Sequence, residues 1–210
     1  MTMKRLILIA SIMMLAAGAY AQNKVGSVTF QPKLGMNIAN FRDNTGDPDP
    51  RFAFVAGGEF EYQVAPKLSF SAGLLYSQQG VTKEGWSGEK KTDTTIKTDY
   101  INIPVMFNAY LVDGLALKFG IQPAFNVAAR YSVSTKEIDI SGDLSDKTIY
   151  INSFDLAVPI GLSYEYKKFV LEARYNCGLI DIKEERKNVV SSFKAKHSVF
   201  QFTLGYKIDL

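Results

Sequence analysis

The stretch that decides the fold is SVFQFTLGYKIDL, residues Ser198 to Leu210. Read in steps of two, one face is apolar and the other is mixed: Phe200, Phe202, Leu204, Tyr206, Ile208 and Leu210 alternate with Val199, Gln201, Thr203, Gly205, Lys207 and Asp209. A period of two is typical of a β-strand, and this segment is long enough to cross a bilayer at a tilt. A strand at the C-terminal end keeps an open edge unless another strand pairs with it, so we expect the sheet to close into a barrel.

Seven earlier segments repeat this alternation, and their apolar positions begin at Val28, Phe52, Leu68, Ile101, Leu115, Phe154 and Phe169. The connections are of two kinds. Residues 65–67, 112–114 and 167–168 make tight turns, whereas long polar segments span 41–50, 80–96, 131–148 and 181–195. Alternate connections of an up-and-down barrel lie at opposite ends, and outer-membrane barrels have short periplasmic turns and long extracellular loops. The sequence therefore predicts an all-β fold, an eight-stranded antiparallel up-and-down transmembrane β-barrel.

Four prolines lie inside these strand-like segments: Pro32, Pro104, Pro123 and Pro159. Each deletes one hydrogen-bond donor from a ladder, so we expect bulges or strand ends at these positions.

Alternation alone does not say which face points inward, because a soluble eight-stranded barrel would turn its apolar face toward a ligand. The polar face carries a glycine in seven of the eight segments, which suits a narrow interior. Aromatic residues lie on the other face, many toward strand ends, as in a girdle that faces lipid. We therefore expect an inward charge network of mixed sign, made of Lys33, Glu59, Glu61, Lys118, Asp155, Glu165, Glu172, Arg174 and Lys207.

Residues 1–21 have the features of a secretory signal peptide, and residues 22–210 would form the barrel domain. Lys4 and Arg5 precede an apolar run of about twelve residues, shorter than the roughly 20 that a spanning helix needs. Without these two bases, 22 of the 24 basic residues face 21 acidic ones, so nothing in the charge favours nucleic acid as a partner. Cys177 is the only cysteine, so no internal disulfide is expected.

Few residues suggest chemistry. His197 is the sole histidine, and we expect it at the rim of the last strand. Asp43, Asp47 and Asp49 crowd the first loop, but their spacing does not match a calcium-binding EF-hand, so a solvated turn is the favoured interpretation. Trp86, between Gly85 and Gly88, is a possible loop contact for a partner. No catalytic set, metal site or cofactor is predicted, and the paired carboxylates Glu59 with Glu61 and Glu165 with Glu172 are expected to be structural.

The chain resembles the PorT-type outer-membrane β-barrel family over essentially the whole mature sequence. The resemblance is carried by these segments: PKLGMN (residues 32–37), YINIPV (100–105), GIQPAF (120–125), VPIGLSYEY (158–166) and EARYNCGL (172–179). It implies an eight-stranded barrel in the bacterial outer membrane, reached after signal-peptide export and without a catalytic motif. The name-giving member is associated with protein secretion, a role that fold alone does not transfer.

The function expected from the sequence is that of a non-enzymatic outer-membrane barrel with a closed lumen, whose surface loops or rim serve interaction or support secretion or envelope assembly. Its expected partners are outer-membrane lipids, the barrel-assembly machinery that inserts it and an envelope or secretion protein. The alternative is an eight-stranded barrel that binds a small lipophilic ligand, either a lipocalin-like carrier or a membrane barrel that handles lipids or solutes.

Overall fold

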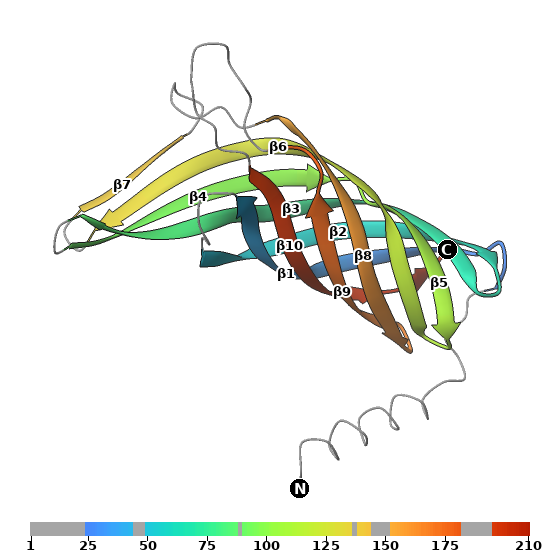
Figure 1. Ribbon diagram of the computed structural model, residues 1–210. Helices are drawn as coiled ribbons and strands as arrows, with labels where there is room; N and C mark the ends of the chain where they lie inside the picture. Colours follow the sequence, from blue (N-terminus) through green and yellow to red (C-terminus); the bar gives the residue numbers. More distant parts are fainter. Residues whose placement is uncertain (1–23, 44–48, 88–89, 136–137, 144–151, 182–194) are drawn as a thin grey trace, which may run out of the picture.

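The computed structural model describes residues 24–43, 49–87, 90–135, 138–143, 152–181 and 195–210, which form a closed antiparallel barrel (Figure 1). Its strands are β1 (Val28–Asp43), β2 (Asp49–Ala65), β3 (Leu68–Ser87), β4 (Lys90–Asn102), β5 (Val105–Val112), β6 (Leu115–Thr135), β7 (Ile138–Asp143), β8 (Phe154–Tyr166), β9 (Phe169–Gly178), β10 (Ala195–Tyr206) and β11 (Ile208–Asp209). The signal peptide predicted for residues 1–21 lies outside the described residues.

These strands occupy eight positions around the barrel. β4 and β5 together fill the position between β3 and β6, β7 and β8 pair with successive parts of β6, and β11 continues β10 along β1. The barrel closes where β1 pairs with β10, from Lys33 opposite Gly205 to Asp43 opposite Ala195. The predicted eight-stranded antiparallel barrel, closed by its C-terminal strand, is therefore confirmed. No helix in the described ranges is long and apolar enough to cross a membrane.

The two faces of each strand have opposite environments. On β10, Phe200 and Phe202 are 52% and 48% exposed, whereas Val199 and Gln201 are 2% and 1% exposed. The apolar face therefore points outward and the mixed face fills the interior, as in a barrel that meets lipid. A lipocalin-like soluble carrier would have its apolar face inward, which is the opposite of the arrangement in this barrel. Outward aromatic rings also pack in cross-strand pairs, such as Tyr175 with Phe200 at 4.7 Å between ring centroids.

The connections are partly as predicted. Tight turns join β2 to β3, β5 to β6 and β8 to β9, and two of them use the left-handed backbone region, at Gly114 (φ 77°) and Lys167 (φ 58°). The expected second long loop is wrong over most of its length. Residues 80–87 and 90–97 pair as continuations of β3 and β4, and β6 and β7 pair in the same way from Arg130 to Asp143. Figure 1 shows β3, β4, β6 and β7 reaching well past the ends of the other strands.

The four strand prolines have two outcomes. Pro104 lies in the break between β4 and β5, as expected for a residue that lacks a ladder donor. The bulges or strand ends expected at Pro32, Pro123 and Pro159 are wrong, because β1, β6 and β8 run through them without a register shift.

The reason is that a strand residue directs its N–H at only one of its two neighbours. Pro32 keeps its register partner Gly58 in β2, while on its other side the C-terminal strand is interrupted between β10 and β11. Pro159 keeps Asn176 in β9 and lies beside a gap in the β6–β8 ladder. Each of these two prolines therefore lies beside a ladder that is already interrupted, so its missing donor needs no bulge.

Candidate functional site

The middle of the barrel holds five charged side chains from four strands. Lys33 on β1 contacts both Glu59 on β2 and Glu172 on β9, with its Nζ at 2.6 and 2.7 Å from their Oε2 atoms. Lys118 on β6 reaches the same two oxygens at 3.4 and 3.1 Å. Arg174 on β9 donates from Nη2 to Oε1 of Glu59 at 2.9 Å and from Nε to Oε1 of Glu172 at 2.6 Å. We call these five residues the central cluster.

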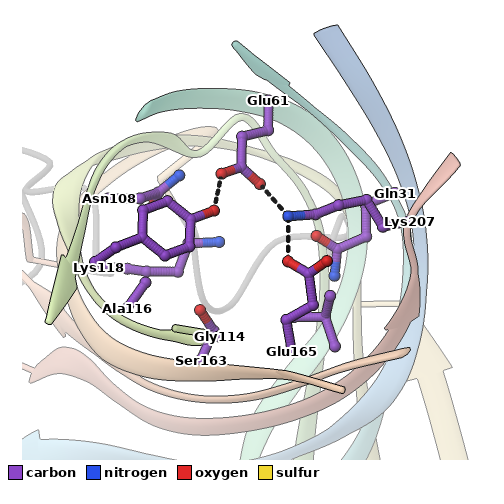
Figure 2. A pocket seen from close by; sticks show the side chains of 11 residues that line it. Gln31, Glu61, Asn108, Gly114, Ala116, Lys118, Ser163, Glu165 and Lys207 are labelled. Atoms are coloured by element: carbon purple, nitrogen blue, oxygen red, sulfur yellow. Dashed lines mark hydrogen bonds and ion pairs between the residues drawn. The ribbon is translucent and has the colours of Figure 1, made fainter. Parts of the chain in front are cut away.

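A second group lies nearer the tight-turn end and is drawn in Figure 2. Lys207, between β10 and β11, lies between two carboxylates, with Nζ at 2.6 Å from Glu165 Oε2 and 3.3 Å from Glu61 Oε2. Glu61 also accepts hydrogen bonds from the hydroxyls of Tyr110 and Ser69. We call Glu61, Glu165 and Lys207 the lower cluster.

The two clusters compensate each other in charge. The central cluster has three cations and two carboxylates, and the lower cluster has one cation and two carboxylates, so together they hold four of each sign. Their side chains are at most 8% exposed. An unpaired charge in such a place would cost several kcal/mol, whereas dense pairing offsets most of that desolvation. The two clusters together thus form a neutral network in the interior.

The space left beside the lower cluster is small. A cavity of about 10 Å³ lies among side chains that include Glu61, Lys118, Glu165 and Lys207. That volume is on the scale of one water molecule. This cavity therefore does not hold a solute much larger than water.

Glycines stand opposite the charged residues in the strand register. Gly73 faces Glu59, and Gly161 faces both Lys118 and Arg174. A Cβ at Gly73 would overlap the Glu59 side chain and the carbonyl oxygen of Gly58, and one at Gly161 would lie 2.6 Å from the carbonyl oxygen of Ala173. The inward glycines therefore make room for the long charged side chains of neighbouring strands.

A third polar group lies toward the loop end, and it corrects one prediction. His197, expected at the rim, is buried inside the barrel at 2% exposure. Its Nδ1 lies 2.6 Å from Gln79 Oε1 and 3.6 Å from Asp155 Oδ2, and its ring meets the Tyr100 ring edge-on at 5.1 Å. The cause is parity: His197 shares its face with Val199 and Gln201, because β10 begins three residues earlier than the sequence predicts.

Eight of the nine charged residues predicted to line the lumen therefore fall into the two clusters, and Asp155 lies apart with His197. Tyr110 and Asn108 were expected on the inward face, but the sequence reasoning did not single out other uncharged polar partners, among them Asn37, Ser69 and Gln79. The available signal was their place on the same inward face.

In the described part of the chain, the loop end includes a sheet. Beyond the barrel wall, backbone pairing runs from Lys83–Ser87 of β3 through β4 and β6 to β7. We call this four-stranded extension the loop-end sheet. Trp86 lies in it, in register with Lys91, but its side chain lies outside the described part of the structure.

The first-loop aspartates cannot be placed as a group. Asp47 and the side chains of Asp43 and Asp49 lie outside the described part. Among the described residues there is no group of three or more His, Cys, Asp or Glu side chains that could hold a metal ion.

Comparison with known proteins supports the fold. The family model described as outer membrane protein beta-barrel domain matches residues 20–184. Among solved structures, Ail, the attachment invasion locus protein of Yersinia pestis, in complex with the heparin analogue sucrose octasulfate, is similar at a TM-score of 0.52 and 13% identity, over 88% of this chain and 100% of Ail. Neisserial surface protein A is similar at 0.44 and 15%, over 86% and 97%. OprG from Pseudomonas aeruginosa is similar at 0.40 and 12%, over 89% and 97%. No curated protein matched by sequence.

Proposed function

We propose that this chain, which belongs to the outer membrane protein beta-barrel domain family, is a non-enzymatic barrel that acts through its loop end. It lies in the bacterial outer membrane, with its apolar face toward lipid. We further propose, in line with its resemblance to PorT-type proteins, that it supports protein secretion or envelope assembly by binding an envelope protein. The barrel-assembly machinery would insert it.

The observation that carries the proposal is the neutral network that the central and lower clusters form in the interior. Every carboxylate of the central and lower clusters is held by a lysine or an arginine. A catalytic acid or base needs access to a substrate, and a transport protein needs a path through the lumen. The cavity beside the lower cluster also leaves a lipophilic ligand no space. What remains for function is the surface, and the loop end is its most elaborate part.

The loop-end sheet supports a binding role because it has unpaired strand edges. In the described part of the chain, β7 pairs with β6 alone, and residues 83–87 of β3 pair with β4 alone. An exposed edge offers a row of backbone N–H and C=O groups to an incoming strand. We propose that an envelope partner adds a strand to one of these edges.

The test is photocrosslinking in intact cells. A photoreactive amino acid replaces Ser141 on β7, and in a control it replaces Asp113 in the tight turn at the other end. A discrete crosslinked partner from position 141 and not from position 113 is expected. No adduct at position 141, or the same adduct at both positions, would contradict binding at this edge.

The secretion role is tested separately. Cells that lack the chain are complemented with the native protein or with a β7 variant in which Ser141 is replaced by proline, which removes a backbone donor from the edge strand. We expect the native chain, and not the variant, to restore secreted protein. Full restoration by the variant would leave the β7 edge without a role in secretion, and no secretion defect without the chain would contradict the role itself.

A further inference from the structure

Two cations face each other on the outside of the barrel, near the loop end. Arg42 on β1 and Lys196 on β10 are register partners in the pair of strands that closes the barrel. Arg42 is exposed and Lys196 is half-buried, and both follow the outward positions of their strands. Like charges directly opposite each other weaken a β-sheet pair. An external anion would remove this repulsion.

The Arg42 side chain is held in place by β9, the strand on the far side of β10. Arg42 Nη2 donates to Cys177 Sγ at 3.1 Å and to the carbonyl oxygen of Gly178 at 3.3 Å. These contacts hold one edge of the guanidinium against β9, across the width of β10. A planar guanidinium has five N–H donors, so others stay available to an acceptor.

Two hydroxyls lie one step down the same outer face. Ser198 follows Lys196 at the next outward position of β10, and its Oγ lies 3.0 Å from the Tyr175 hydroxyl on β9. Directly below, the Tyr175 ring packs on Phe200, which is 52% exposed on the lipid-facing surface. The order along the wall is therefore cations, then hydroxyls, then apolar rings. A phosphorylated lipid has the same order, with an anionic headgroup above its acyl chains.

A second pair of like charges shows what is missing here. Lys97 on β4 and Arg130 on β6 are also exposed register partners, but Asp143 of β7 stands in register with Arg130. For Arg42 and Lys196, no carboxylate in the described part of the chain forms an ion pair with either residue. The Lys97–Arg130 pair thus has an acid in register beside it, whereas no acid stands in register with Arg42 or Lys196 in the described strand pairings.

We propose that Arg42 and Lys196, together with the Ser198 and Tyr175 hydroxyls, bind the phosphate of an anionic lipid headgroup in the outer leaflet. The cations neutralise the phosphate, the hydroxyls donate to its oxygens, and the acyl chains lie along Phe200 and the apolar positions below it. The lipid thereby joins β1 to β10 at the seam where the barrel closes. This inference rests on the outer-membrane location and is independent of the partner proposed for the loop-end sheet.

The test uses the full folded barrel in micelles of an uncharged detergent, titrated with lipid A, a diphosphorylated glycolipid, and read by native mass spectrometry. The variant R42Q/K196Q removes both charges, and K67Q/K167Q removes two exposed charges at the tight-turn end as the matched control. We expect R42Q/K196Q to lose about tenfold or more in lipid A affinity, since charged hydrogen bonds to phosphate are strong, while the control keeps the native value. Equal binding by native protein and R42Q/K196Q, or an equal loss in both variants, would overturn the site.

Two further arms keep the test decisive. Inorganic phosphate in place of lipid A is expected to bind at least about tenfold more weakly, because it lacks acyl chains to bury; equal binding would mean a phosphate site rather than a lipid site. K196E places an acid opposite Arg42, so this variant should resist heat unfolding without lipid and gain nothing from added lipid A. If lipid A raised the unfolding temperature of K196E as much as that of the native barrel, the proposal would be wrong.

Discussion

Replacing Glu172 by glutamine tests the central cluster directly. The carboxylate pairs with Lys33 at 2.7 Å, with Lys118 at 3.1 Å and with Arg174. The amide keeps the shape but not the charge, so three buried cations would share the single carboxylate of Glu59. At an effective dielectric constant of about 20, one unit pair near 3 Å is worth roughly 5 to 6 kcal/mol before desolvation is subtracted. Breaking a buried ion pair costs about 3–5 kcal/mol net, which is the loss of unfolding free energy that we expect.

The charge balance gives this prediction a second part. The central cluster has a net charge of +1, E172Q raises it to +2, and E172Q/K118M returns it to +1. The double variant should therefore be more stable than E172Q alone, although it lacks two native side chains. Two substitutions at independent sites normally lower the unfolding free energy additively. A double variant that is more stable than E172Q alone therefore measures the coupling within the cluster.

The assay is urea unfolding of the barrel in lipid vesicles, with the folded fraction read from gel mobility before boiling. Asp113→Asn, in an exposed turn, is the matched control and should stay within about 0.5 kcal/mol of the native chain. If E172Q were equally close to native, or if the double variant were less stable than E172Q, the charge-balance argument would be refuted.

Three further predictions use the same preparation. Gly73→Ala should cost about 1–3 kcal/mol, because the added Cβ overlaps Glu59; native stability in the urea titration would contradict this. Phe107→Arg on the lipid face should cost about 2–4 kcal/mol, more than Asn108→Ser at about 1 kcal/mol, and the reverse ranking would mean an inward apolar face. Unboiled folded protein should migrate differently from boiled protein, and identical migration would count against closure.

Strand parity carried most of the fold prediction. A period of two separates the faces of each segment, and the turns set which segments pair, so the number of barrel strands and the inward residue set followed from the sequence. The bulges or strand ends expected at Pro32, Pro123 and Pro159 were wrong because a missing N–H donor was assumed to disrupt pairing on both sides of a strand. Pro32 shows that one side is enough to keep the register.

The loop-end sheet was hidden for a different reason. Above the membrane neither face needs to be apolar, so the alternation disappears while backbone pairing continues. The segment KTDTTI, residues 91–96, falls in the predicted polar loop, yet its β-branched threonines favour extended structure. Counting β-branched residues as well as apolar ones would have extended β4.

The sequence predicts which charged residues line the lumen, but not which of them pair with each other. Sequence alone placed nine charges on the inward face, but which ones meet depends on the register between strands that are far apart in the chain. Gly73 opposite Glu59 and Gly161 opposite Arg174 show a usable signal, since a small residue stands across from each of these two long charged ones.

The central claim is that a neutral network of ion pairs fills the lumen, so that function lies at the surface. Single-channel recording of the pure full-length barrel in a planar bilayer tests it most directly, with the same membrane without protein as the baseline. We expect no stepwise current, because eight strands enclose only enough space for side chains and the cavity beside the lower cluster is about 10 Å³. Stable, stepwise conductance from the native chain would contradict the filled lumen and point to transport instead.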